Sequence, residues 1–408
     1  MRSSWVLISL LNFIIASIMG VLLRYVFVAE IPWMDYRNML HGHSHVAMLG
    51  WVYLILFALL VDVFVPRAKQ SSPFYNRLFW FTQFTVLGMM VSFPIQGYGA
   101  VSISFSTLHI IASYLFVWRI WKDLDIQSDQ VRLMVKSSLI FLLISTIGIW
   151  AMGPVMALQL RSDPLYIIVV QFYLHFQFNG WFALAVLALF IHLLNRWGIH
   201  FQNRHFYSFF YIYIGGLVLT FFQVLHWAYL EHYMYIINAA GVVLQVLSFV
   251  VLLYPIRARL FHKLTEKSGT VKWLLGFGMV SLMIKVTMQA ALVLPEVMEI
   301  STTIRQFMVG YIHLTMLGFI TGIILLLLYV REVAVINTAG IYVFSIGYIM
   351  TEAILFLQGI FFWGRWGALP YYHEVLLGFS LLLPLGLFVM VLKPAIPELS
   401  QGVNHIKA

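Results

Sequence analysis

Twelve long apolar runs constrain this chain more than any other feature of its sequence. A helix needs about 20 apolar residues to cross the hydrocarbon core of a bilayer. Such runs lie near residues 4–23, 43–65, 77–97, 99–121, 136–160, 166–194, 206–226, 233–255, 273–294, 307–330, 340–361 and 372–393. The sequence therefore predicts an all-α polytopic membrane protein, with twelve transmembrane helices in a single membrane domain over residues 1–408.

Composition excludes other classes of protein. Only 10% of the residues are charged and 62% are hydrophobic, whereas soluble domains are about a quarter charged. An outer-membrane barrel would show alternating segments of roughly ten residues, but these runs are continuous and twice as long. The absence of Cys excludes disulfides, Cys-ligated zinc, iron–sulfur clusters and c-type haem attachment. A tightly held metal would therefore depend on His, Tyr, Met or carboxylate side chains.

The Lys and Arg residues predict how the chain is oriented. Eighteen of the 24 lie at the termini or in the loops after even-numbered runs. By the positive-inside rule, we expect both termini on the cytoplasmic side of the cell (inner) membrane. The net charge of +9 is then an orientation signal, and no nucleic-acid partner is expected.

A histidine motif recurs on the second, sixth and tenth runs. The segments HGHSHVAMLGW, YLHFQFNGW and YIHLTMLGF align on His45, His175 and His313, each followed five residues later by Gly and then by an aromatic residue. Their separations, 130 and 138 residues, are each about a third of the chain. The motif predicts three pseudo-repeated four-helix arcs, approximately residues 1–135, 136–272 and 273–408.

Histidines concentrate at one predicted depth. Nine of the 14 fall in the outer half of the predicted topology: His41, His43, His45, His109, His175, His226, His232, His313 and His373. Ionisable groups inside a membrane are costly and are functional hypotheses by default. Neutral imidazole is a standard nitrogen ligand for haem iron and copper, and a low-spin haem takes two axial ligands on opposite faces.

Repetition favours a ligand role for His45, His175 and His313. For the looser set on the fourth, eighth and twelfth runs, His109, His232 and His373, structural hydrogen bonding is the favoured interpretation, with metal or propionate contact as the alternative. His41 lies one helical turn before His45 and shares its face. His43 is interpreted as interfacial, an interpretation that also remains open for His41.

In these residues the chain resembles the catalytic subunits of haem–copper oxidases and nitric oxide reductases, particularly the cbb-type enzymes. That resemblance implies a low-spin haem with His313 as one axial ligand and His45 or His41 as the other. It also implies His175 as a copper ligand. Tyr311 stands where the family has its high-spin haem ligand. The resemblance therefore supports one bis-His haem b more strongly than a haem–copper pair.

The chain departs from the family at the copper site. The family's tandem His-His pair after the seventh span is absent, and His226 and His232 are the nearest substitutes. With this incomplete ligand set, the chain also resembles the NnrS-like haem- and copper-containing membrane proteins associated with nitric oxide stress. Arg365 is a candidate for a haem propionate or for a lipid headgroup.

Three functional hypotheses follow. The first is a haem protein that handles nitric oxide or dioxygen, an oxidoreductase with an incomplete ligand set, supplied by a quinol or cytochrome donor. The second is a haem protein without turnover: a sensor, haem carrier or electron conduit. The third is a transporter, since internal repeats and midplane polar groups are also typical of transporters. The threefold, same-oriented repeat argues against the third.

Overall fold

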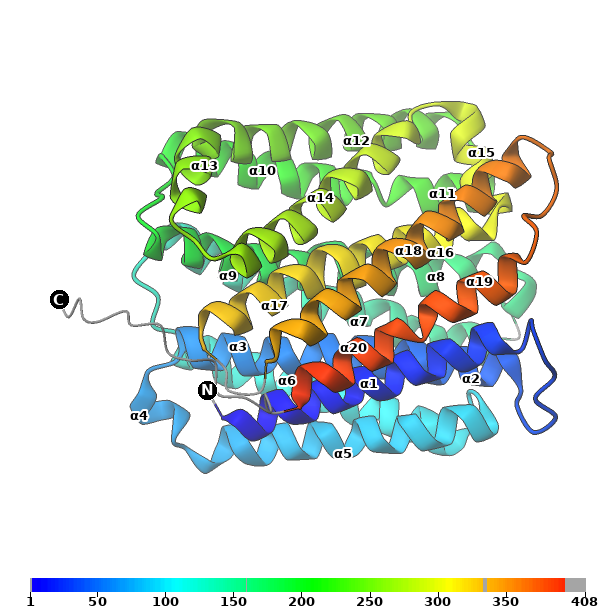
Figure 1. The fold of residues 1–408 in the computed structure, drawn as a ribbon, viewed down its shortest axis with the longest axis horizontal. Helices are drawn as coiled ribbons and strands as arrows, with labels where there is room; N and C mark the ends of the chain where they lie inside the picture. Colours follow the sequence, from blue (N-terminus) through cyan, green and yellow to red (C-terminus); the bar gives the residue numbers. More distant parts are fainter. Residues whose placement is uncertain (1, 159, 333–335, 393–408) are drawn as a thin grey trace.

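The computed structural model describes residues 2–158, 160–332 and 336–392, and every regular element within these ranges is a helix. The helices run roughly along one common direction in a single bundle (Figure 1). In the described ranges, twelve helical segments are long and apolar enough to cross a membrane. The predicted all-α polytopic membrane protein is thereby confirmed.

The spans follow the chain in order. The first four are α1 (Ser3–Tyr25), α2–η1–α3 (Tyr36–His45, Val46–Tyr53, Leu54–Phe64), α5 (Pro73–Gln96) and α6 (Ala100–Asp123). The next four are α7 (Asp129–Ala157), α8–η3–α9 (Pro164–His175, Phe176–Phe182, Ala183–Arg196), α10–α11 (Asn203–Leu219, Phe222–Tyr229) and α12–η4–α13 (His232–Leu253, Tyr254–Ile256, Arg257–Thr265). The last four are α14 (Gly269–Ala291), α16–η5–α17 (Arg305–His313, Leu314–Ile320, Thr321–Val330), α18 (Thr338–Trp363) and α19–α20 (Tyr372–Ser380, Leu382–Val391). Short helices α4 (Arg67–Gln70), η2 (Leu160–Ser162) and α15 (Pro295–Thr303) lie in the connections.

The second span begins earlier than hydropathy predicts. Its polar first turns are helical because Asp35 caps them, accepting a hydrogen bond from the Asn38 backbone N–H at 2.7 Å. Between the third and fourth spans the chain reverses at Gly97, whose φ of 58° suits glycine. These two spans follow each other closely because a tight turn connects them.

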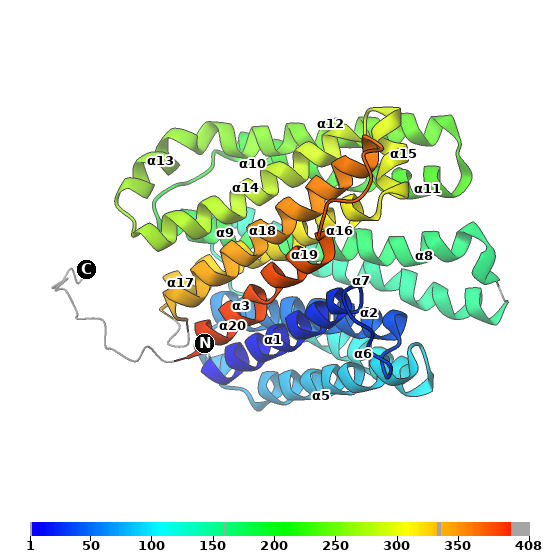
Figure 2. The ribbon, with the colours of Figure 1, turned by 45° about the vertical axis from the view of Figure 1, so that its right-hand side comes forward.

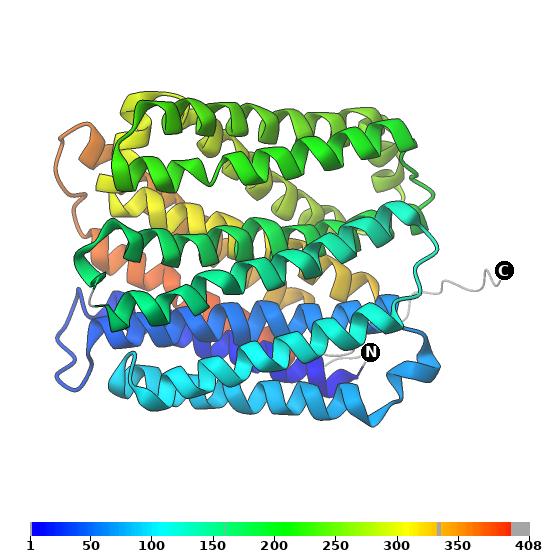
Figure 3. The ribbon, with the colours of Figure 1, turned by 180° about the vertical axis from the view of Figure 1, so that it is seen from behind.

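Spans two, six and ten form the centre of the bundle. Of their most apolar segments, 78%, 83% and 78% of the residues are buried, against 28–50% for the other spans in the described ranges. Trp51 on η1 donates a hydrogen bond from Nε1 to Thr321 Oγ1 on α17 at 3.0 Å, which joins spans two and ten at the core. The remaining helices surround this core, as the views from opposite sides show (Figures 1 and 3).

Each copy of the histidine motif is followed by a π-helical segment. His45, His175 and His313 are the last residues of α2, α8 and α16, and η1, η3 and η5 begin at the next residue. π-Helical turns are rare and often lie at functional sites. The same local structure therefore recurs at all three copies, although residues 393–408 of the third predicted arc lie outside the described residues.

Side chains satisfy one backbone carbonyl in each π segment. Backbone polar groups within a bilayer need internal partners. The pairs are Asn12 Nδ2 with Gly50 O at 3.0 Å, Tyr213 OH with Asn179 O at 2.7 Å, and Thr321 Oγ1 with Met316 O at 2.8 Å. The motif glycines also allow close helix packing: a Cβ on Gly180 would lie 2.7 Å from Phe141 of α7, and one on Gly50 would lie 2.9 Å from Val86 of α5.

The two ends of the bundle differ. α1 begins and α20 ends at the same end (Figures 1 and 2), as an even number of spans requires. We call the opposite end, where α1 ends and α2, α8 and α16 begin, the far end. The helices that end in His45, His175 and His313 all start there, so the three motif histidines lie at comparable depth.

Candidate functional site

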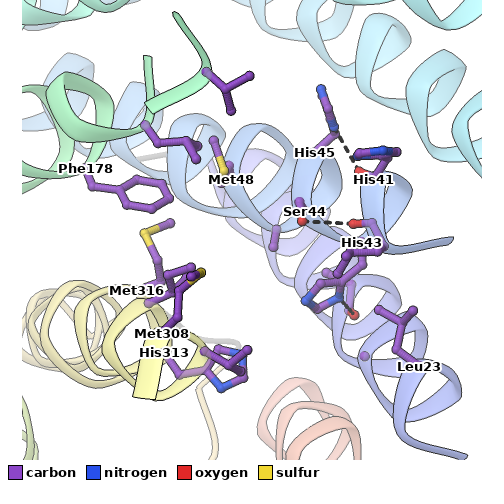
Figure 4. A pocket seen from close by; sticks show the side chains of 18 of the residues that line it. Leu23, His41, His43, Ser44, His45, Met48, Phe178, Met308, His313 and Met316 are labelled. Atoms are coloured by element: carbon purple, nitrogen blue, oxygen red, sulfur yellow. Dashed lines mark hydrogen bonds between the residues drawn. The ribbon is translucent and has the colours of Figure 1, made fainter. Parts of the chain in front are cut away.

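A large cavity occupies the far end of the bundle. It has a volume of about 1020 Å³ and is lined by residues of α1, α2, α6–α8, α16, α19 and neighbouring segments. Ligand pockets typically measure about 300–1,000 Å³, so the cavity has room for a large planar group. Its walls include His41, His43, His45 and His313 (Figure 4).

His43 is held against the first span. Its Nδ1 donates to the backbone carbonyl of Ala16 at 2.8 Å. Its ring lies against Gly20, where a Cβ would come within 3.1 Å of His43 Cε1. The missing side chain at Gly20 therefore makes room for the ring, and the bond to Ala16 leaves Nε2 free for another partner.

His313 is held from the eleventh span. Its Nδ1 bonds Glu352 Oε1 at 3.0 Å, with the carboxylate side chain only 7% exposed. The other carboxylate oxygen, Oε2, is buried without a hydrogen-bond partner among the described residues. This contact fixes the imidazole and again leaves Nε2 free.

His43 and His313 approach the cavity from spans two and ten. Figure 4 shows His43 on the side of α2 that faces α16, the helix that carries His313. Metal-ligating histidines almost always donate their other ring N–H to a carbonyl or a carboxylate. Both side chains have that arrangement, so both suit the role of a ligand to haem iron.

Two guanidinium groups line the same cavity. Arg24 at the end of α1 bonds Ser380 Oγ of α19 and interacts electrostatically with Glu352. Arg305 at the start of α16 bonds the Tyr36 hydroxyl. Guanidinium groups bind carboxylates well, so these two cations suit the propionates of a haem.

His45 and His41 line the cavity from the other side of α2. His45 Nδ1 donates to the His41 carbonyl at 2.9 Å, and its ring stacks on Phe93 with centroids 4.1 Å apart. The His41 ring meets Tyr98 edge-on at 4.7 Å. Figure 4 shows both rings pointing away from His313. Of the histidines on the second span, the geometry therefore favours His43 as the partner of His313.

The three expected copper ligands lie apart from this cavity. His175 Nε2 bonds the Leu217 carbonyl at 2.8 Å, and the residue is not part of the cavity wall. His226 bonds the Glu231 carbonyl at 3.1 Å, and His232 stacks on Tyr235. Across the described ranges, no three His, Asp or Glu side chains come together in a group that could hold a metal ion. These residues therefore do not fit a copper centre.

Tyr311 and Arg365 also lie away from the cavity wall. The Tyr311 ring faces Lys285, whose Nζ lies 5.7 Å from the ring centroid. Arg365 is exposed in the turn after α18, with a φ of 57°. The arginines that do face the cavity are Arg24 and Arg305.

Sequence reasoning missed His43, Arg24 and Gly20. Residues two apart on a helix point to nearly opposite sides, so a motif of three alternating histidines places His43 opposite His41 and His45. The sequence pattern alone does not show which side faces the tenth span. A glycine near the end of span one, at the depth of these histidines, is the signal that would have favoured His43.

Comparison with known proteins adds no family to this geometry. No protein-family model matches the chain, and no curated protein matches it. The functional argument therefore depends on the residues themselves.

Proposed function

We propose that this protein is a haem-binding integral membrane protein with a redox role. The single observation that carries the proposal is the pair His43 and His313, facing one cavity from two central spans. Each has its Nδ1 bonded to an acceptor and its Nε2 free. Arg24 and Arg305 would hold the propionates of a haem b. When bound, the haem would supply one-electron chemistry.

The redox role has two versions. In the first, the protein handles nitric oxide or dioxygen, which the resemblance to haem–copper oxidases and nitric oxide reductases supports. A quinol or a cytochrome would then be the electron donor. In the second, the protein is an electron conduit, sensor or haem carrier. If His43 and His313 both held the haem iron, no coordination position would remain open, and this favours the second version.

Spectroscopy of the purified protein tests the haem proposal. We expect about one b-type haem per chain and sharp reduced α and β bands. His43→Ala and His313→Ala should both lose these bands, and His200→Ala, an exposed histidine elsewhere on the molecule, should keep them. A colourless protein from haem-replete cells would refute the proposal and return the transporter hypothesis.

Carbon monoxide separates the two versions of the proposal. If the reduced protein binds carbon monoxide, an axial position opens and gas handling is supported. If its spectrum does not change, the electron-conduit, sensor or carrier version is supported.

The orientation proposed from the Lys and Arg distribution places both termini on the cytoplasmic side of the inner membrane. Reporter fusions at each terminus would test it, because cytoplasmic and periplasmic reporters give opposite signals.

A further inference from the structure

A lysine is buried between spans six, nine and ten, outside the cavity described above. Lys285 lies on α14 and is only 5% exposed. Its Nζ donates to Asn179 Oδ1 at 2.8 Å and more weakly to Gln289 Oε1 at 3.5 Å. Both acceptors are neutral amides, and the third neighbour is the face of the Tyr311 ring.

No carboxylate compensates this ammonium group. Among the described residues, none lies within ion-pair distance of Lys285, although ion pairs form elsewhere, as between Arg331 and Asp62. A buried charge without a counter-charge is strongly unfavourable. In membrane interiors such groups usually belong to a functional site. The surroundings of Lys285 therefore lack a negative charge that would compensate its ammonium group.

The surroundings of Lys285 offer further polar groups. Asn179, Tyr311 and His175 belong to the central spans, yet each is only partly buried, so each keeps surface that a small ligand can touch. Amide N–H and phenol O–H groups are donors that a small anion accepts.

We propose that Lys285, together with Asn179 and Tyr311, forms a binding site for a small monovalent inorganic anion of the size of chloride or nitrite. Such an anion would neutralise the ammonium group without requiring a carboxylate on a neighbouring helix. The site is separate from the proposed haem ligands, so it stands or falls independently of the haem proposal.

Anion-dependent thermal stability of the full-length protein tests the site. The protein is purified in detergent with sodium gluconate and titrated with sodium chloride or sodium nitrite at constant ionic strength. We expect a saturable rise in melting temperature of roughly 3 °C at ten times the dissociation constant. Absence of any rise with either anion overturns the proposal.

Variants on the same helix locate the effect. Lys285→Met should lose the anion-dependent rise and melt in gluconate no lower than the natural protein, because the uncompensated charge is gone. Lys272→Met, which removes an exposed lysine from the same helix, should keep the full rise. Lys285→Arg, which retains the charge, should keep at least part of it. Equal anion dependence in the natural protein and Lys285→Met would assign the effect to other residues and overturn the proposal.

Discussion

Gly20 gives the sharpest test of the pairing between His43 and His313. A Cβ added at Gly20 would lie 3.1 Å from His43 Cε1 and 3.4 Å from Nδ1. Carbon atoms in ordinary contact are about 3.5–4.0 Å apart, so Gly20→Ala requires the ring to withdraw by about 0.5 Å. The 2.8 Å bond to Ala16 would then lengthen to about 3.3 Å, beyond the usual range.

The expected cost follows from that lost hydrogen bond. A net contribution of about 0.5–1.5 kcal/mol corresponds to roughly a 2- to 10-fold weaker affinity for haem. Gly20→Val adds two more methyl groups at the same point, and we expect it to abolish haem binding. The measurement is haem per polypeptide, titrated into the haem-free protein and followed by the reduced spectrum.

A second glycine supplies the control for Gly20. Gly276 on α14 has no atom within 4 Å of an added Cβ, so Gly276→Ala and Gly276→Val should bind haem as the natural protein does. If Gly20→Val binds haem with unchanged affinity and an unchanged spectrum, His43 is not a ligand and the pairing is wrong.

Substitutions at three further positions test other contacts. Glu352→Gln keeps an acceptor for His313 Nδ1 and should retain the haem, whereas Glu352→Leu removes it and should weaken haem binding about tenfold or more; equal binding by the two variants would contradict the positioning role. His109 is buried with Nε2 unpartnered, so His109→Phe should keep the haem spectrum and should not lower the melting temperature. Trp51→Phe removes the bond to Thr321 and should lower the free energy of unfolding by about 0.5–1.5 kcal/mol, since one buried hydrogen bond is lost while Thr321 keeps its bond to the Met316 carbonyl; chemical unfolding that shows no change would contradict this.

The fold could be predicted well because the bilayer leaves few alternatives. A continuous apolar run of about 20 residues must be a helix in lipid, and all twelve predicted runs overlap spans in the described ranges. The errors lie at polar ends such as Tyr36–His45. There a capping carboxylate, rather than hydropathy, determines where the helix begins.

The site could be predicted only in part, because depth and direction are separate properties. Hydropathy and the repeat place His43, His45 and His313 at one depth. The direction of each ring depends on the rotation of its helix, which packing against glycines such as Gly20 and Gly50 decides. The sequence motif also does not reveal the π-helical turns that follow His45, His175 and His313.

The π segments determine where the central spans can lose a residue. An α-helical hydrogen-bonded turn encloses one residue fewer than a π-helical one. Deleting a single residue between Val46 and Tyr53 would let η1 close as an α-helix, and α2 and α3 would keep nearly the same relative orientation. Deleting one residue from α3, which is already α-helical, would instead turn everything beyond the deletion by about 100°. Loss of one residue should therefore disturb the packing of this span far less in η1 than in α3.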